Sequence, residues 1–266
     1  MNATLTRADT VQRFGEALYG ALRTRQPTPP ISSTAPHLTV DDAYAISLAF
    51  LTRRLADGER VVGKKIGVTS AAVQEMLGVR QPDFGFLTDA MMVSGDRIPI
   101  DQLGLIQPRA EAEIAFILSR PLAGPGVTAE DVLAATEAIA PCFEIVDSRI
   151  QDWRIGIVDT IADNASCGVF VLGAARADPK QLDLPGLRCR VTKNGRFLSE
   201  GVGSAVQGSP LHSVAWLANT LGAYGVSFDA GEIVLSGSLV PLEPAAAGDR
   251  FEMTLEGVGA CVANFF

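Results

Sequence analysis

The sequence predicts an α+β fold, in which a helical N-terminal part packs on a mixed, β-rich C-terminal part. Apolar residues recur at helical spacing within the first part, residues 1–60. Beyond it, short apolar runs separated by glycine turns are typical of strands. These strands are not regularly interleaved with helices, which disfavours a doubly wound parallel sheet.

Two helices joined by a loop are expected in residues 1–60. The first helix carries an apolar stripe formed by Val11, Phe14, Leu18, Ala21 and Leu22. The second begins at Thr39-Val40-Asp41-Asp42, which resembles a capping box, and ends near Asp57 and Gly58. Residues 26–33 between them contain three prolines, and we expect this loop to lack regular structure.

The rest of the chain is expected to contain strands and a few helices. Helices are predicted from Ser70 to Leu77, from the capping box at Thr128, and from Ser209, where Pro210 occupies the favoured first turn. Lys193-Asn194-Gly195-Arg196 separates two short runs and indicates a β-hairpin. Further strands are expected at residues 232–235, 250–255 and 260–266.

Composition and charge exclude several classes of protein. A content of 47% hydrophobic and 20% charged residues is typical of a folded globular protein. The net charge of -8 is not offset by any basic stripe, which argues against nucleic-acid binding. No apolar run approaches the roughly 20 residues that span a membrane. The N-terminus lacks the pattern of a signal peptide, so we expect a cytoplasmic protein.

The cysteines and histidines restrict the kind of metal site. The four cysteines are scattered without CxxC spacing, which indicates reduced thiols rather than zinc ligands. The chain has only two histidines. A metal site must therefore be built mainly from oxygen, which favours hard ions such as Mg²⁺ or Mn²⁺.

Glu111 and Glu113 lie one residue apart at the start of one of the most apolar runs in the chain. A strand alternates its side chains between two faces, so both carboxylates are expected on one face. Two adjacent like charges on an apolar strand are unfavourable without a positive partner, and a divalent metal ion is the simplest partner. The alternative is an edge strand whose glutamates face water.

Glu144 is a third carboxylate, alone inside the apolar run of residues 139–147. Buried carboxylates are rare unless they are paired or coordinate a metal. Three carboxylates would form half of an octahedral shell and leave positions for waters and a chelating substrate. The alternative for Glu144 is a structural ion pair with Arg109 or Arg149.

Lys64 and Lys65 lie in a predicted strand that runs into a helix N-terminus at Thr69 and Ser70. Free N–H groups and the positive helix dipole at such an end suit a carboxylate substrate. The two lysines point to opposite faces, so one can face inward and carry a proton. The alternative is two surface lysines at a strand edge.

Two polar segments are open to more than one interpretation. Asp83 lies in a turn-like stretch, where simple turn chemistry would account for it. The Asp163-Asn164-Ala165-Ser166 segment precedes an apolar strand, and its groups suit either a small polar ligand or a loop of Asx turns. Cys167 is expected to be a buried structural thiol, and His212 to be packed beside Trp216.

Taken together, five segments resemble the hydratase/decarboxylase family of aromatic meta-cleavage pathways, within the fumarylacetoacetate hydrolase superfamily. They occur in the family's order and cover nearly the whole chain. The Glu-x-Glu pair with a later Glu marks the superfamily, and GKKIGVTS and DNAS narrow the match to this family. The segments are GKKIGVTS at 63–70, QPDFG at 81–85, PRAEAEIAF at 108–116, FEIVDSR at 143–149 and ADNAS at 162–166.

The resemblance implies a helical region at 1–60 and a fumarylacetoacetate hydrolase-like catalytic domain at 61–266. It implies that Glu111, Glu113 and Glu144 bind Mg²⁺ or Mn²⁺, and that a small 2-hydroxydienoate chelates the metal ion. No organic cofactor is required. It also implies a homo-oligomer, and an association with the 4-oxalocrotonate decarboxylase that supplies the substrate.

The resemblance also assigns roles to residues around the metal ligands. Lys65 is expected to be the main proton-transfer or electrostatic group, and Asp83 to position or deprotonate water. Ser166, Asn164 and Thr69 are expected to hold the substrate.

The segment at 236–244 favours the branch of the family that hydrates 2-hydroxypenta-2,4-dienoate to 4-hydroxy-2-oxopentanoate. Three alternatives remain open. The first is 4-oxalocrotonate decarboxylation, and the second is a non-catalytic partner subunit. The third is hydration of a longer diacid, which would need an extra cation at the far end of the pocket, and the sequence does not locate one.

Overall fold

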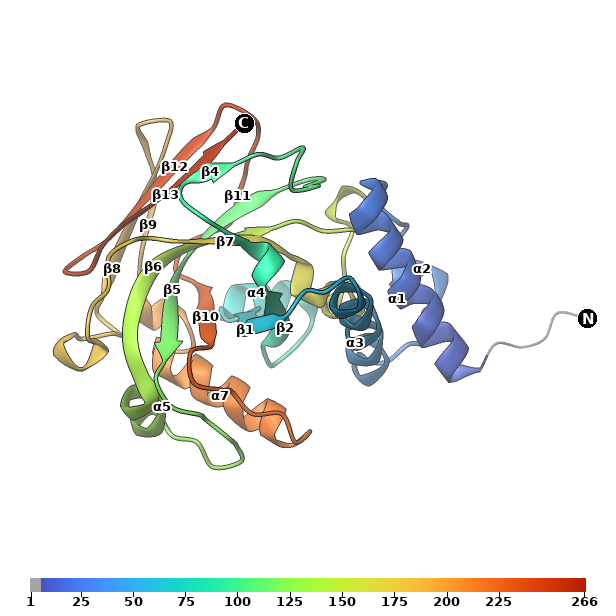
Figure 1. Cartoon of the computed structure of the whole chain (residues 1–266), viewed down its shortest axis with the longest axis horizontal. Helices are drawn as coiled ribbons and strands as arrows, with labels where there is room; N and C mark the ends of the chain where they lie inside the picture. Colours follow the sequence, from blue (N-terminus) through green and yellow to red (C-terminus); the bar gives the residue numbers. More distant parts are fainter. Residues whose placement is uncertain (1–5) are drawn as a thin grey trace, which may run out of the picture.

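The computed structural model describes residues 6–266 and confirms the predicted α+β architecture. Three helices come first in the chain and lie together at one side of the molecule, at the right in Figure 1, while the strands form two sheets on the other side. The bounds of these helices are α1 (Arg7–Thr24), α2 (Ile31–Thr34) and α3 (Val40–Ala56).

Capping boxes start α1 and α3, as the sequence predicts for α3. Thr39 accepts a hydrogen bond from the backbone of Asp42, whose carboxylate accepts one from the backbone of Thr39. The expectation that residues 26–33 lack regular structure is wrong at their end, where α2 begins. Pro30 is the N-cap of α2, a position at which proline's missing N–H costs the helix no hydrogen bond.

The larger sheet is mixed and carries the candidate site. Its strand order is β2-β1-β10-β5-β6-β7-β3, and β11 pairs with β5. The pairs β1–β10 and β3–β7 are parallel, and the others are antiparallel. The bounds are β1 (Val61–Gly67), β2 (Asp83–Thr88), β3 (Met92–Val93), β5 (Arg109–Leu118), β6 (Thr136–Val146), β7 (Cys167–Leu172), β10 (Ile233–Ser238) and β11 (Glu243–Pro244).

The smaller sheet has the order β4-β13-β12-β8-β9 and includes the predicted hairpin at Asn194-Gly195. Phe143 of the larger sheet packs edge-on against Phe251 of the smaller one, with ring centroids 6.2 Å apart. Such aromatic contacts help to form the core between the sheets. The bounds are β4 (Arg97–Ile98), β8 (Arg188–Lys193), β9 (Arg196–Val202), β12 (Arg250–Leu255) and β13 (Gly259–Phe265).

The remaining helices cover or connect the sheets. The predicted helices α4 (Ala71–Leu77), α5 (Ala129–Ala135) and α7 (Pro210–Gly222) are all present. The short α6 (Ile157–Ala162) packs against α3 in a separate apolar cluster, which includes Phe14, Phe50 and Ile161. The N-terminal helices therefore support the polar segment that follows α6.

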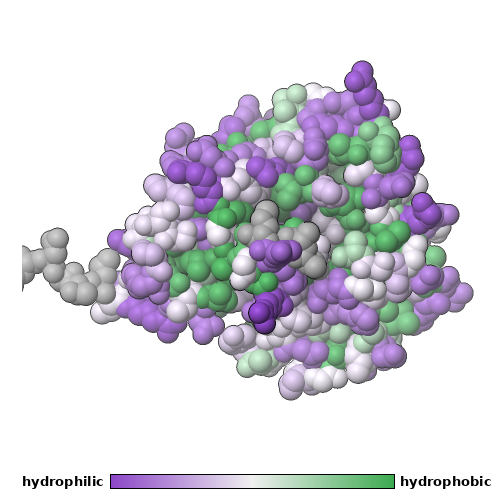
Figure 2. All heavy atoms as spheres, turned by 180° about the vertical axis from the view of Figure 1, so that it is seen from behind, coloured by the Kyte–Doolittle hydropathy of each residue, from purple (hydrophilic) through white to green (hydrophobic). Residues whose placement is uncertain are grey.

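The surface and the helices agree with the prediction, made from composition, of a folded globular protein without a membrane span. The face shown in Figure 2 carries hydrophilic side chains interspersed with apolar ones. Among the helices that the structure describes, none combines the length and the apolar character that a membrane span requires.

Candidate active site

The pairing of β5 with β6 brings the three predicted carboxylates together. Glu111 is directly opposite Glu144, and Glu113 follows two residues later on the same face of β5. One carboxylate oxygen of each residue lies within 4.8 Å of one from each of the others. Glu113 and Glu144 are buried, and Glu111 is partly buried. The alternative of glutamates facing water from an edge strand is therefore wrong.

Several of these buried oxygens have no hydrogen-bond partner among the described residues. Glu113 accepts one hydrogen bond through Oε2, from the backbone N–H of Gly237 at 2.8 Å. Its Oε1 and both oxygens of Glu144 have none. Because burying an unpartnered carboxylate costs free energy, this arrangement fits a bound cation. An all-oxygen donor set suits a hard divalent ion.

The electrostatics of the cluster also favour a cation at this position. Burial raises the pKa of the Glu111 carboxyl to about 7, and the nearby Glu144 adds to the shift. Burial also raises the pKa of Glu113 well above its ordinary value, with contributions from Glu144 and Glu111. The protein alone therefore disfavours three ionised carboxylates here, and a divalent ion would reverse that preference.

Lys65 supplies one positive charge beside the cluster. Its Nζ lies 3.2 Å from Oε1 of Glu144 as an ion pair, without hydrogen-bond geometry. Nζ also donates a hydrogen bond to the carbonyl oxygen of Ala165 at 2.9 Å. Burial lowers the pKa of Lys65, but attraction to Glu144 and Asp83 outweighs it, so the pKa lies above its ordinary value. These two carboxylates therefore favour the ammonium form of Lys65.

Lys64 points to the opposite face of β1, as the alternation predicts. It forms an ion pair with Glu232, and its Nζ lies 4.7 Å from the ring centroid of Phe228. Both lysines are buried, so the alternative of two surface lysines is wrong. The alternative partners of Glu144 are also wrong. Arg149 pairs with Asp163 at 2.6 Å, and Arg109 stacks on Trp153.

Asp83 is the first residue of β2 and is buried, which corrects the turn interpretation. Pairing with β1, where Asp83 is opposite Gly67, turns this stretch into a strand. Oδ2 of Asp83 lies 3.5 Å from the hydroxyl of Thr160, which lies 3.4 Å from the hydroxyl of Ser166. Oδ1 has no hydrogen-bond partner among the described residues.

Sequence reasoning did not single out Thr160. Its one signal was its place in the polar segment before β7.

Burial raises the pKa of the Asp83 carboxyl, and the charge of Lys65 opposes that effect. Asp83 lies at one end of a row of three oxygen-bearing side chains, with Thr160 in the middle and Ser166 at the other end.

Asn164, Ala165 and Ser166 form a strained loop with positive φ angles of 55°, 48° and 53°. Each such non-glycine residue costs roughly 1–3 kcal/mol. The side chain of Asn164 holds the loop to β2, since its amide donates to the carbonyl of Phe86 at 2.9 Å and its Oδ1 accepts from the N–H of Phe86 at 2.8 Å. The loop thereby presents the Ala165 carbonyl to Lys65.

A cavity of about 440 Å³ is lined by four of the eight predicted site residues, Lys65, Asp83, Glu111 and Ser166, and Glu113 and Glu144 are not among its lining residues. Its polar lining residues are Lys65, Asp83, Arg109, Glu111, Asp152, Thr160 and Ser166, and apolar side chains also line it. Asn164 is not among the lining residues, because both polar groups of its amide contact Phe86. The apolar residues are Val68, Val73, Leu77, Val146, Ile155 and Leu242.

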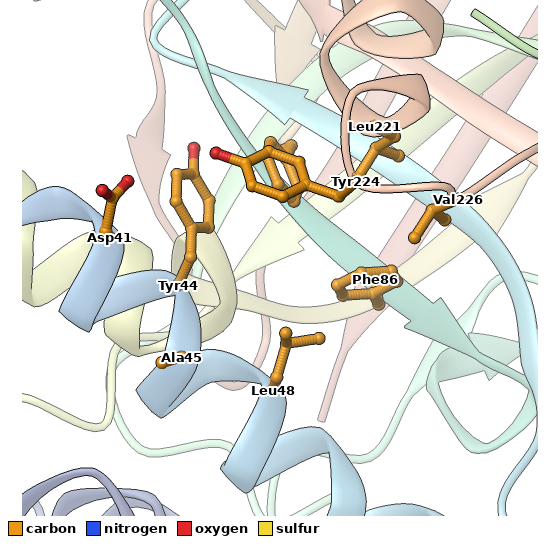
Figure 3. Close-up of a pocket in the computed structure, with 9 residues that line it drawn as sticks. Asp41, Tyr44, Ala45, Leu48, Phe86, Leu221, Tyr224 and Val226 are labelled. Atoms are coloured by element: carbon orange, nitrogen blue, oxygen red, sulfur yellow. The ribbon is translucent and has the colours of Figure 1, made fainter. Parts of the chain in front are cut away.

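Thr69 lines an adjoining cavity, also of about 440 Å³, which shares Glu111 and Leu242 with the first. A third pocket, of about 320 Å³, lies between α3 and the end of α7 and contains none of the clustered glutamates. Figure 3 shows that the hydroxyl of Tyr224 points toward that of Tyr44 in this pocket.

Neither Cys167 nor His212 is among the residues that line the main cavity. Cys167 is buried, as expected, and burial raises the pKa of its thiol well above the ordinary value. His212 lies on α7 but is exposed, so the expectation that it is packed is wrong.

Comparison with known proteins identifies the family to which the chain is similar. The family model for the fumarylacetoacetate (FAA) hydrolase C-terminal region matches residues 66–265. A 2-hydroxyhexa-2,4-dienoate hydratase of Comamonas testosteroni is 60% identical over 256 residues, which cover 96% of this chain and 97% of that protein. A 2-hydroxypent-2,4-dienoate hydratase of Pseudomonas putida is 60% identical over 218 residues, covering 82% and 98%.

Solved structures agree with the sequence matches. A 4-oxalocrotonate decarboxylase from Pseudomonas putida G7, complexed with magnesium and adipate, has a TM-score of 0.93 and 35% identity over 100% of both chains. A fumarylpyruvate hydrolase from Pseudomonas aeruginosa, in complex with Mn²⁺ and pyruvate, has a TM-score of 0.60 and 12% identity over 76% of this chain and 88% of that one. The second match concerns the fold alone.

Proposed function

The chain belongs to the fumarylacetoacetate hydrolase family, and from that premise we propose that it hydrates 2-hydroxypenta-2,4-dienoate to 4-hydroxy-2-oxopentanoate with the help of a divalent metal ion. The observation that carries the proposal is the cluster of three carboxylates with unpartnered buried oxygens. Two relatives at 60% identity are named as hydratases of such dienoates. The reaction belongs to aromatic meta-cleavage catabolism.

Glu111, Glu113 and Glu144 would hold Mg²⁺ or Mn²⁺. When bound, such an ion supplies Lewis-acid stabilisation of the charge that develops on the 2-oxygen of the substrate. Lys65 stands next to Glu144 and adds a second positive charge on the same side of the cavity. These two positive groups would balance the three glutamates and favour a negatively charged substrate group beside them, although the chain as a whole is negative.

The reaction needs proton transfers at the oxygen and carbon atoms of the substrate. A proton moves from the 2-hydroxyl to C5, which gives the 2-oxo-3-enoate; water then adds at C4, and C3 is protonated. The charged ammonium of Lys65 is placed to donate a proton, and its contact with the Ala165 carbonyl fixes its position. Asp83, with one free oxygen in the same cavity, is placed to take a proton from the attacking water.

Ser166 and Thr160 align the substrate and the water. Their hydroxyls are 3.4 Å apart, and Thr160 links the pair to Asp83. The apolar wall of the cavity, which includes Val68 and Leu242, limits the access of other waters to the dienolate.

An ultraviolet assay tests the proposed function. We expect loss of dienoate absorbance when Mg²⁺ or Mn²⁺ is present, and no loss after the metal is removed with a chelator. A second assay measures CO₂ release from 2-oxohex-3-enedioate, because a decarboxylase is 35% identical over the whole chain. Decarboxylation without hydration would overturn the proposal, and a lack of both activities would support the non-catalytic alternative.

Gly67→Ala is expected to lower kcat roughly 100-fold, since small displacements of reacting groups have effects of this size. A Cβ atom at Gly67 would lie 2.3 Å from Oδ1 of Asp83 and 3.2 Å from Nζ of Lys65, so both groups must move. Steady-state kinetics measure the effect. Gly20→Ala in α1 is the matched control, because its Cβ meets nothing within 4 Å. Equal kcat values in the two variants would show that Asp83 and Lys65 need no precise placement.

We also propose that the protein acts in the cytoplasm as a homo-oligomer and associates with the decarboxylase that supplies its substrate. All four cysteines are free and buried, which suits a reducing compartment. Light scattering of the purified protein, alone and mixed with that decarboxylase, measures both assemblies. A monomeric mass in both samples would refute this proposal.

A further inference from the structure

Arg149 is a buried cation that the proposed reaction does not use. It follows the end of β6 and is 1% exposed. Its guanidinium pairs with Asp163, which is also buried, and Nε lies 2.6 Å from Oδ1 of that carboxylate. Arg149 is not among the residues that line the main cavity. Any effect of Arg149 on the reaction must therefore pass through the groups that it contacts.

The contacts of Arg149 lie on both sides of the strained loop at residues 164–166. Before the loop, Nη2 donates to the carbonyl of Asp163, and the backbone N–H of Arg149 donates to Oδ2 of Asp163 at 2.9 Å. After the loop, Nη1 donates to the carbonyl of Cys167 at 2.8 Å. One side chain thus ties together the two residues that flank the loop.

The loop needs such a clamp because its backbone conformation is unfavourable. Three consecutive non-glycine residues with positive φ persist only where the surrounding structure holds them. The amide of Asn164 anchors one end to Phe86, and at the other end the carbonyl of Ser166 accepts from the N–H of Asp147 at 2.8 Å. Nη1 of Arg149 also donates to the carbonyl of Asp147, so the guanidinium joins this anchor to the loop as well.

The middle residue of the loop provides the link to the reaction. The carbonyl of Ala165 accepts a hydrogen bond from Nζ of Lys65 at 2.9 Å, and the same Nζ lies 3.2 Å from Oε1 of Glu144. If the flanking residues moved apart, the loop would relax toward favourable φ angles, and the carbonyl of Ala165 would move away from Lys65.

We propose that Arg149 is a positioning residue of the hydration reaction. By holding Asp163 and Cys167 together, it keeps the carbonyl of Ala165 in the place that fixes Nζ of Lys65. The inference rests on the proposed function, because it takes Lys65 as the proton-transfer group of the hydratase. Arg149 thus controls turnover without touching the substrate.

Steady-state kinetics of Arg149→Lys, with the dienoate and Mg²⁺, test the proposal. The variant keeps the buried positive charge but lacks the planar fork, and we expect kcat to fall roughly 100-fold. In a Lys65→Met background the same substitution should change kcat by less than about 2-fold, because no ammonium group remains to be positioned. Arg54→Lys is the matched control and should keep the wild-type kcat, since Arg54 is also buried but its side chain bonds to Glu59 and Thr88 rather than to the loop.

Hydrogen–deuterium exchange of the peptide that contains residues 163–167 follows the loop without reference to activity. We expect faster exchange in Arg149→Lys than in the wild type, and no change in this peptide in Arg54→Lys. If Arg149→Lys does not fold, Arg149→Met combined with Asp163→Asn removes the buried pair without leaving a lone charge, and it should show the same effects on kcat and on exchange.

A wild-type kcat or unchanged loop exchange in the Arg149 variant would overturn the inference alone. An equal fall in kcat in the wild-type and Lys65→Met backgrounds would also overturn it, because the effect would then not pass through Lys65. A wild-type protein without hydratase activity would overturn the proposed function and this inference with it. The wild type is assayed first, so the two kinds of failure give different results.

Discussion

Glu113→Gln is expected to abolish hydratase activity while leaving the metal-free protein at least as stable as the wild type. The substitution keeps an oxygen that can accept the N–H of Gly237 and removes one of the clustered buried charges. Relief of like-charge repulsion favours the folded state. The loss of a metal ligand removes the chemistry, so stability and activity change in opposite directions.

Urea unfolding with and without Mg²⁺ measures this effect. A ligand at about 100 times its Kd stabilises the folded state by about 2.7 kcal/mol, and the wild type should gain an amount of this order. Glu113→Gln should gain far less. Glu137→Gln is the matched control, because Glu137 lies on β6 with Glu144 but is exposed. A variant at Glu113 that kept the full Mg²⁺-dependent gain would rule out the metal site.

Lys65→Met is expected to lower kcat roughly 100- to 10,000-fold, the range for loss of a general acid or base. Methionine fills most of the buried volume of the lysine stem but has no proton to transfer. It also removes the positive partner of Glu144. Steady-state kinetics with the dienoate separate a fall in kcat from a rise in KM, and a role in substrate binding alone would change KM.

The neighbouring lysine provides the control for this experiment. Lys64→Met combined with Glu232→Gln removes a buried ion pair from the other face of β1 without leaving a lone charge. This double variant should change the free energy of unfolding and leave kcat close to the wild-type value. If Lys65→Met kept near-normal turnover, Lys65 would not be the proton-transfer group.

Local patterns predicted the parts of the site that depend on strand alternation. Glu111 and Glu113 share a face because they are two residues apart in an extended strand, and Lys64 and Lys65 point in opposite directions for the same reason. The capping box at Thr39 is equally local, because its two partners are three residues apart. Such features need no knowledge of the rest of the chain.

Features that depend on tertiary contacts could not be derived in the same way. Asp83 follows a proline and looks like a turn residue, and only its pairing with β1 makes it part of a strand. The partner of Glu144 is Lys65 rather than Arg149, because the side chains of Lys65 and Glu144 approach to 3.2 Å although β10 and β5 lie between their strands, and Arg149 pairs with Asp163. The contact between Arg109 and Trp153 likewise joins residues from β5 and a distant loop.

The uninterrupted register between β5 and β6 has a consequence for how this protein can evolve. Pairing runs without a shift from Arg109 to Ile117, so a one-residue insertion in this stretch would turn Glu144 or the Glu111 pair to the opposite face. The three carboxylates therefore depend on the length of these strands as well as on their own identities. Other segments that line the cavity, such as α4 and the loop that carries Trp153, can vary in length without disturbing the carboxylates, so insertions that change the substrate range are expected there.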